Sequence, residues 1–548
     1  MTGSDSGGHR ALIRHGSTLS LLTLVSRVLG LVREMAKASL LGTSGLSDAF
    51  SVAFMIPNLF RRLFAEGSIA VAFIPTFKEY LLAEEQAAGQ AEEQAAGQGA
   101  GAPLRGPEIT REFLSCALSF LSVTVSLAVA LGILITPLVI PAFKLEEFDE
   151  AVFLTRLMFP FLAFISLAAL FQGILNSLRI FTPSGLAPIV LNLVTILAAY
   201  SLSPFTKNPA RALALGILVG GFLEAAIQLP FVLATGRRFF FVSFKRTLTN
   251  PGTRKILRLI GPTIIGMAAY QLNDLVSTAL AGNAGQGVVS SLQYSLRLQE
   301  LILGVFAVSI GTVLLPDLSE HAKSGRWDIY SHQLAAAMNI IAFITIPITF
   351  FSLAQGQTLI RLLFQNRSFD ENSVTLTLAA LNFHMPGLFF IALNRILAPA
   401  FYAQSDSTSP TLAGILSFAS NILFAALLVR PMRGSGIALA LSLASAVNTI
   451  LLLVFLRKNP NIRVKQVLGS ALAYAAKLIA LSALAALPLL VLGPRLTALF
   501  SGHGRLVSQG LPLAVSALLY AAIGLTLLLA TGDRQLHTII SMFRRRNS

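Results

Sequence analysis

The chain has 548 residues, of which 54% are hydrophobic and only 12% are charged. The charged share is about half of that in soluble proteins, and apolar residues gather in long blocks such as 113–140 and 506–530. A membrane-crossing helix needs about 20 consecutive apolar residues. The composition therefore excludes a soluble protein and predicts an all-α polytopic membrane protein. The net charge of +16 is the excess of Lys and Arg typical of cytoplasmic loops, so it predicts no nucleic-acid partner.

About 14 apolar segments are long enough to span a bilayer. In chain order, the predicted spans are 18–40, 46–78, 111–142, 151–179, 184–203, 209–235, 255–282, 286–317, 330–356, 371–402, 409–430, 433–457, 467–492 and 507–531. An even number of spans places both termini on one side. The basic loops 236–258 and 457–465 fall on that same side, which predicts that both termini are cytoplasmic.

Two sequence repeats organise the chain. Residues 58–75 align weakly with 299–316, and 176–188 align with 402–414. Parallel repeats of this kind are typical of transporters. They predict an N-lobe over 1–236, a C-lobe over 237–458, and a third part, 459–548, with the last two spans and a basic tail. Within the N-lobe, residues 82–110 contain a tandem eight-residue repeat, AEEQAAGQ, and are interpreted as a flexible cytoplasmic insertion.

Charged residues interrupt three of the predicted spans. A charge at the bilayer centre costs about 3 kcal/mol on insertion scales, so such residues face a protein interior or a water-filled cavity. Intramembrane ion pairs that hold helices in register are one explanation. The presence of arginines in both repeat halves favours another, a cavity for an anionic substrate, because the planar guanidinium suits phosphate or carboxylate. The charges are Arg27, Arg33 and Glu34 in the first span, Asp48, Arg61, Arg62 and Glu66 in the second, and Arg297 and Glu300 in the eighth.

Three polar residues form a candidate cation site, because amide and carboxylate oxygens are ligands for hard cations. These are Asn273 and Asp274 in the seventh span and Asn421 in the eleventh. Hydrogen bonding between helices explains them equally well. His384, beside Pro386, predicts a packing or kink role. The sequence has no Walker A, HExxH or CxxC pattern, and therefore predicts no enzyme, no cofactor and no metal centre.

Three stretches carry a family resemblance. SRVLGLVRE (26–34), PNLFRRLFAEG (57–67) and LAPAFYAQSDSTSP (397–410) resemble the MurJ (MviN) lipid II flippases of the multidrug/oligosaccharidyl-lipid/polysaccharide exporter superfamily. The resemblance implies two six-helix lobes around a cationic cavity for the diphosphate and headgroup of lipid II. It also implies a groove for the polyprenyl tail, formed by the last two helices.

The resemblance assigns roles residue by residue. It implies substrate binding by Ser26, Arg27, Arg33, Arg61 and Arg297. The charged residues Glu34, Asp48, Arg62, Glu66 and Glu300 are the candidates for charge pairing or gating. The family often has aspartate where this chain has Glu34. Some relatives bind sodium through two aspartates. Here Asp274 matches one of them, and Ala425 stands where the other is expected.

The implied function is transport of lipid II by alternating access from the cytoplasmic to the outer leaflet of the bacterial inner membrane, which serves peptidoglycan synthesis and cell shape. The implied partners are lipid II, membrane lipids and the cell-wall synthesis machinery, and the driving force is membrane potential, Na⁺ or H⁺. Two alternatives stay open. One is a flippase for another polyprenyl-linked saccharide. The other is a cation-coupled exporter of small molecules, which predicts acidic cavity walls.

Overall fold

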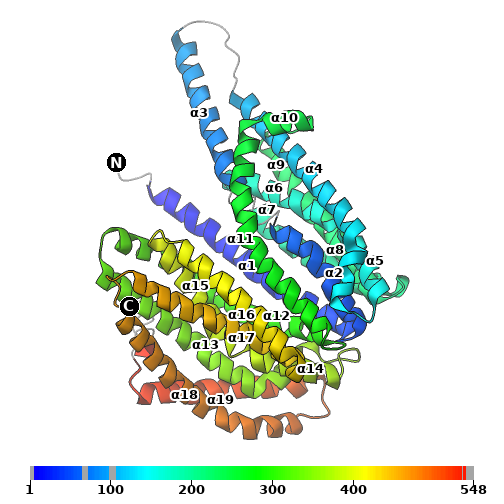
Figure 1. The fold of residues 1–548 in the computed structure, drawn as a ribbon, viewed down its shortest axis with the longest axis vertical. Helices are drawn as coiled ribbons and strands as arrows, with labels where there is room; N and C mark the ends of the chain where they lie inside the picture. Colours follow the sequence, from blue (N-terminus) through cyan, green and yellow to red (C-terminus); the bar gives the residue numbers. More distant parts are fainter. Residues whose placement is uncertain (1–4, 64–71, 98–105, 534, 538–548) are drawn as a thin grey trace. The chain divides into compact units, whose positions relative to one another are not determined.

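The structure is a computed structural model that describes residues 5–63, 72–97, 106–533 and 535–537, and every regular element in these ranges is helical (Figure 1). The all-α fold is therefore confirmed. The chain divides into two compact units, residues 1–275 and 276–548. This division falls within a helix and reflects compactness rather than the sequence repeat, so the lobe limits near 236 and 458 stay a prediction.

Long apolar helices make up most of the described part of the first unit. Its elements are α1 (Asp5–Leu41), α2 (Gly45–Arg61), α3 (Ile74–Gly97), α4 (Gly106–Val139), the 3₁₀ turn η3 (Ile140–Phe143), α5 (Phe148–Met158), α6 (Phe161–Ser177), α7 (Thr182–Ser201), the 3₁₀ turn η4 (Ser203–Phe205), α8 (Pro209–Ala226), α9 (Leu229–Ala234), α10 (Phe244–Thr249) and α11 (Pro251–Gly282), whose last residues pass into the second unit.

The second unit continues the same pattern. Its elements are α12 (Val288–Lys323), α13 (Trp327–Phe364), α14 (Glu371–His384), α15 (Gly387–Ala403), α16 (Thr408–Met432), α17 (Gly434–Phe455), the 3₁₀ turn η5 (Leu456–Lys458), α18 (Val464–Leu499), the π-helical turn η6 (Leu506–Gly510) and α19 (Leu511–Ala530).

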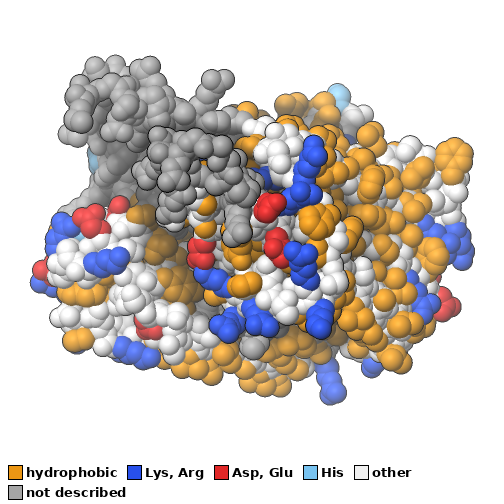
Figure 2. All heavy atoms as spheres, turned by 90° about the horizontal axis from the view of Figure 1, so that it is seen from above, with side chains coloured by type: hydrophobic (Ala, Val, Ile, Leu, Met, Phe, Trp, Pro, Cys, Tyr) orange, Lys and Arg blue, Asp and Glu red, His pale blue; other side chains and the backbone are white. Residues whose placement is uncertain are grey.

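Among the described residues, nine helices are long and apolar enough to cross a membrane, and ten if the bent pair α14 and α15 forms one span. These correspond to ten of the predicted spans. The other four predicted spans, 18–40, 46–78, 255–282 and 286–317, contain the charged and amide residues singled out above and are not among these ten. Their described parts are helical, and the total of 14 stays a prediction. Figure 2 shows hydrophobic side chains over much of one described face, as contact with lipid requires.

The low-complexity insertion differs from the expectation. Residues 82–97 continue helix α3, and α4 begins at Gly106; residues 98–105 lie outside the described ranges. Residues 82–110 were interpreted as a flexible insertion because the segment is polar and repetitive. Alanine, glutamate and glutamine all have high helix propensity, so the repeat extends the preceding helix. Ion pairs tie α3 to residues further along the chain, with Glu84 at 2.6 Å from Arg237 and Glu79 at 2.5 Å from Lys255.

The core of the first unit joins α1, α2, α5, α6 and α8. Phe50 of α2, Leu154 of α5 and Phe161 of α6 are buried together there. The turn before α2 fixes its direction, because the Ser44 hydroxyl accepts a hydrogen bond from the Ser47 backbone N–H at 3.2 Å. Such a cap satisfies a backbone donor that the first helical turn leaves open. The cap and the core together hold α2 beside α5, which positions the polar face of α2.

Glu150 and Arg211 link α5 to α8 through a bidentate ion pair. Arg211 donates from Nε to Glu150 Oε1 at 2.7 Å and from Nη2 to Oε2 at 2.8 Å. Hydrogen bonds to charged groups are worth about 1.5–3 kcal/mol. We expect Glu150→Gln to lower the free energy of unfolding by about 2 kcal/mol, measured as a lower thermal midpoint of the detergent-solubilised chain. The exposed neighbour Asp149 supplies the control, Asp149→Asn, and an equal loss in both variants would contradict the role of the pair.

The core of the second unit places α18 and α19 against α13. Leu489 of α18 and Tyr520 of α19 are buried beside Phe350 of α13, and the Tyr520 hydroxyl donates to the Pro347 carbonyl at 2.9 Å. Elsewhere in the unit, α16 packs on α17, and α12 packs on both α14 and α15. The last two helices therefore pack directly on α13 of the second unit.

Asp533 anchors the chain where it leaves α19. Lys477 Nζ lies 2.8 Å from Asp533 Oδ2, and the Tyr474 hydroxyl donates to Oδ1 at 3.1 Å. Burial raises the pKa of the Asp533 carboxyl, but the hydrogen bonds from Lys477 and from the Leu536 backbone lower it more, so its pKa lies below the ordinary value.

A carboxyl with a depressed pKa stabilises the fold above its unfolded pKa of about 3.9, and this contribution is lost as the pH falls through the folded pKa. We therefore expect Asp533→Asn to lower the thermal midpoint at pH 7. The difference from the parent chain should shrink as the pH falls below about 4. A difference that stays constant between pH 7 and pH 3 would contradict the ionic anchor.

Candidate substrate-binding site

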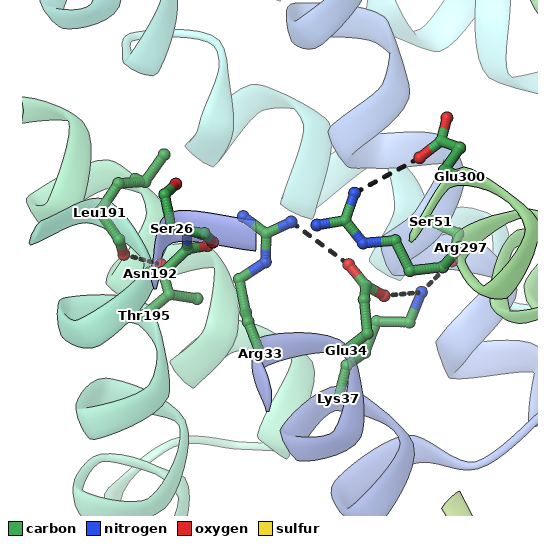
Figure 3. Close-up of polar contacts among 10 residues, drawn as sticks. All are labelled: Ser26, Arg33, Glu34, Lys37, Ser51, Leu191, Asn192, Thr195, Arg297 and Glu300. Atoms are coloured by element: carbon green, nitrogen blue, oxygen red, sulfur yellow. Dashed lines mark hydrogen bonds and ion pairs between the residues drawn. The ribbon is translucent and has the colours of Figure 1, made fainter. Parts of the chain in front are cut away.

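A cluster of charges lies on α1 and reaches α2 (Figure 3). Arg33 Nη2 lies 3.3 Å from Glu34 Oε1, and Lys37 Nζ lies 3.6 Å from Glu34 Oε2. The Lys37 ammonium also donates to the Ser51 hydroxyl of α2 at 3.1 Å. Glu34 is therefore shared between two cations, and Lys37 connects the two helices.

Two arginines of α1, Arg27 and Arg33, lie on surfaces that remain partly open. The Arg33 side chain is 18% exposed, and its guanidinium lies 5.9 Å from the ring centre of Phe54. Arg27 is half-buried. The adjacent Ser26 is held through its backbone, because the Asn192 amide of α7 donates to the Ser26 carbonyl at 3.3 Å (Figure 3). The packing of α1 on α7 thus fixes the rotation of α1 at this level.

The second predicted span supplies three more of the expected charges. Arg61 donates from Nε to Asn58 Oδ1 at 2.7 Å, and Arg62 donates to Gln271 of α11 at 3.5 Å. Asp48 is buried, 3% exposed, and interacts electrostatically with Lys37. The expected partner of Arg62, Glu66, lies outside the described residues.

In the second unit, Arg297 and Glu300 lie one helical turn apart on α12. Arg297 Nη1 lies 3.4 Å from Glu300 Oε2, and their side chains are 32% and 54% exposed. An ion pair this open is weak, because water screens both partners. The guanidinium therefore stays accessible to an anionic ligand.

The candidate cation site is divided between the two units. Asn273 and Asp274 lie on α11 in the first unit, whereas Asn421 lies on α16 in the second. Asn421 is buried and donates to the Ser277 hydroxyl at 2.9 Å. That bond joins two helices, as the alternative interpretation of Asn421 expected. No cluster of three or more His, Cys, Asp or Glu residues able to hold a metal ion occurs within the ranges that the structure describes.

Lys37 is the residue that the sequence analysis missed. It follows Arg33 by four positions and Glu34 by three, which places all three on neighbouring parts of one helix face. Its side chain is only 5% exposed. In the sequence, Lys37 did not differ from the other charges in this span. The packing of α2 encloses Lys37, whereas the arginine side chains stay partly exposed.

The fold and these charges define a class: a multi-pass helical membrane transporter. Two solved structures share the fold. One is the inward-facing conformation of a multidrug resistance MATE family transporter of the MOP superfamily, with a TM-score of 0.60 and 14% identity over 83% of this chain and 98% of that one. The other is a MOP superfamily transporter from Pyrococcus furiosus, with a TM-score of 0.54 and 14% identity over 82% of this chain and 95% of that one.

Sequence comparison is more specific. The family model for the lipid II flippase MurJ matches residues 37–502, and the chain belongs to this family of transporters. It is 44% identical to a probable lipid II flippase MurJ of Treponema pallidum (strain Nichols), over 95% of this chain and 96% of that one. It is 33% identical to the lipid II flippase MurJ of Burkholderia cenocepacia, over 82% and 84%. A solved lipid II flippase MurJ in an inward closed conformation shares the fold, with a TM-score of 0.71 and 22% identity over 94% of this chain and 99% of that one.

Proposed function

We propose that this chain moves lipid II from the cytoplasmic to the outer leaflet of the bacterial inner membrane by alternating access. The observation that carries the proposal is the set of partly exposed arginines within helices of a chain whose relatives are lipid II flippases. Lipid II carries a diphosphate, and the guanidinium fork matches phosphate oxygens in pairs. Arg27, Arg33 and Arg61 of the first unit and Arg297 of the second are the proposed diphosphate ligands.

Electrostatics supports a reversible site. Glu34 and Glu300 each lie beside an arginine, at 3.3 and 3.4 Å. These separations are longer than the 2.7–2.9 Å typical of charge-assisted hydrogen bonds. A diphosphate can therefore replace each carboxylate as the partner without breaking a tight contact. After release, the glutamates again neutralise the arginines, which allows the empty transporter to return.

The charge of the loops supports an orientation with both termini in the cytoplasm, because the basic segments 236–258 and 457–465 are predicted to lie on the same side as the termini. Membrane potential is the proposed driving force, because moving one elementary charge through 100 mV is worth about 2.3 kcal/mol. Sodium is a weaker candidate for coupling, since Ala425 is buried and offers no ligand. Lipid II, the surrounding lipids and the cell-wall synthesis machinery are the proposed partners.

A flippase activity can be tested with the purified full chain in proteoliposomes that contain lipid II. The proposal predicts that the externally accessible fraction of lipid II rises over time in these vesicles and not in vesicles without the protein. A parallel set contains a polyprenyl-diphosphate saccharide that lacks the peptide. Movement of the second lipid alone would contradict lipid II as the substrate and support the alternative lipid-linked saccharide.

A further inference from the structure

One span of the second unit is broken near its middle. Helix α14 ends at His384 and α15 begins at Gly387, and the two helices meet at an angle of 47°. Pro386 lies between them and has no N–H to give to the preceding turn. Backbone carbonyls at such a break lose their usual helical partners, and within a bilayer other groups of the protein must satisfy them.

Side chains from three different helices donate hydrogen bonds to the backbone carbonyls at this break. The Ser442 hydroxyl of α17 donates to the Phe383 carbonyl at 2.6 Å, and the Thr349 hydroxyl of α13 donates to the Met385 carbonyl at 3.1 Å. Between them, the Gln299 amide of α12 donates to the His384 carbonyl. The three consecutive carbonyls of residues 383–385 thus each receive a hydrogen bond from a different helix. The break in the span is therefore stabilised by specific contacts.

The repeat in the sequence supports this reading. The spacing that aligns 176–188 with 402–414 also aligns Pro160 with Pro386. In the first unit, α5 ends at Met158 and α6 begins at Phe161. A span interrupted by proline therefore occurs at the equivalent place in both copies, and interrupted spans in corresponding positions mark the functional region of many transporters.

Packing around the break leaves little room for movement. A Cβ atom added to Gly387 would lie 2.3 Å from the Ser442 hydroxyl and 2.9 Å from the Ser442 Cα. Gln299 and His384 are 2% and 1% exposed. The helices that meet here are held by side-chain hydrogen bonds in a closely packed site, where losing a donor to a buried carbonyl costs free energy.

Helix α12 is attached to the break twice. The Ser295 hydroxyl lies 2.7 Å from His384 Nδ1, and Gln299 binds the carbonyl of the same histidine. Ser295 and Gln299 are four residues apart and share one helix face. Arg297 lies two residues from each, or about 200° around the helix, so it projects from the opposite side.

We propose that Ser295 and Gln299 are positioning residues that fix the rotation of α12 and thereby the direction of Arg297. This inference rests on the proposed function, in which Arg297 binds the diphosphate of the substrate. Two contacts to one buried histidine hold α12 at a single rotation. Loss of either contact allows the helix to turn, and the guanidinium on its far side moves away from the ligand.

The test is a double-mutant cycle on lipid II binding to the full chain in nanodiscs. Gln299→Met keeps the size of the side chain and removes the donor. We expect Arg297→Ala to weaken binding about tenfold and Gln299→Met about fivefold. Once Arg297 is replaced, Gln299→Met should weaken binding by less than about twofold. Such non-additivity is expected only if Gln299 acts through Arg297.

Two further variants control for general destabilisation. Gln333→Met alters a glutamine on α13 whose Oε1 atom is buried and has no hydrogen-bond partner among the described residues, and it should leave affinity unchanged. Ser295→Ala removes one hydroxyl and should give a smaller effect with the same dependence on Arg297. Unchanged affinity in Gln299→Met, or an equal loss with and without Arg297, would overturn this inference alone. Unchanged affinity in Arg297→Ala would overturn the proposed role of Arg297 and this inference with it.

Discussion

Arg33→Ala is expected to weaken lipid II binding by at least about tenfold, the equivalent of one lost hydrogen-bonded charge pair with phosphate. Arg33 keeps part of its surface open and contacts one carboxylate, Glu34, at 3.3 Å. After the substitution, Glu34 still pairs with Lys37. The thermal midpoint of the chain should therefore change little, and the substitution should lower the affinity for lipid II.

The measurement is the dissociation constant of lipid II for the full chain in nanodiscs. Arg238→Ala is the matched control, because Arg238 is an exposed arginine in the basic segment 236–258. If both variants lose affinity by a similar factor, the loss is explained by the lower net charge of the chain and not by a contact of Arg33 with the ligand. Unchanged binding in Arg33→Ala would remove Arg33 from the proposed diphosphate site.

Lys37→Met is expected to lower the free energy of unfolding by about 3 kcal/mol or more, because removing one member of a buried ion pair leaves an uncompensated charge. Lys37 is enclosed between α1 and α2, where it binds Ser51 and lies beside Glu34. Asp48 is buried as well and interacts with the same ammonium. Methionine fills the space of the lysine stem but removes the cation beside the buried Asp48 carboxylate, whereas Glu34 keeps its contact with Arg33.

A second substitution distinguishes lost charge balance from lost packing. Lys37→Met combined with Asp48→Asn removes one cation and one anion, and should recover part of the thermal midpoint lost in Lys37→Met alone. Lys37→Arg, which keeps the charge, should cost less than Lys37→Met. If the double variant is no more stable than Lys37→Met, the charge argument is wrong and Lys37 acts through packing.

The two predictions separate residues that the sequence could not tell apart. Arg33 and Lys37 are one turn apart on the same predicted span, and both are cations where lipid was expected. Hydropathy and spacing predict that each must face protein or water, but not which one is enclosed. That distinction depends on where the side chains of α2 lie, which is tertiary information. Arg33 was therefore predicted as a candidate, whereas Lys37 was missed.

Other elements show the same limit. The long apolar blocks predicted the ten spans that correspond to long apolar helices, because a bilayer requires uniform composition over a fixed length. A packing or kink role was predicted for His384 beside Pro386, and the span bends by 47° at this place. Its partners on α12, α13 and α17 could not be predicted, since they are distant in sequence. Residues 82–110 were predicted as a flexible insertion, and residues 82–97 extend helix α3, since the alanine, glutamate and glutamine that make up most of the repeat favour a helix.

The most direct test of the central claim is made in bacteria depleted of their own lipid II flippase and supplied with this chain. The quantity to measure is lipid II accessible on the outer face of the inner membrane, with the membrane level of the chain matched between strains. The account predicts that the parent chain restores accessible lipid II and growth, whereas Arg33→Ala and Arg297→Ala do not. Full restoration by both variants, or no restoration by a well-expressed parent, would contradict it.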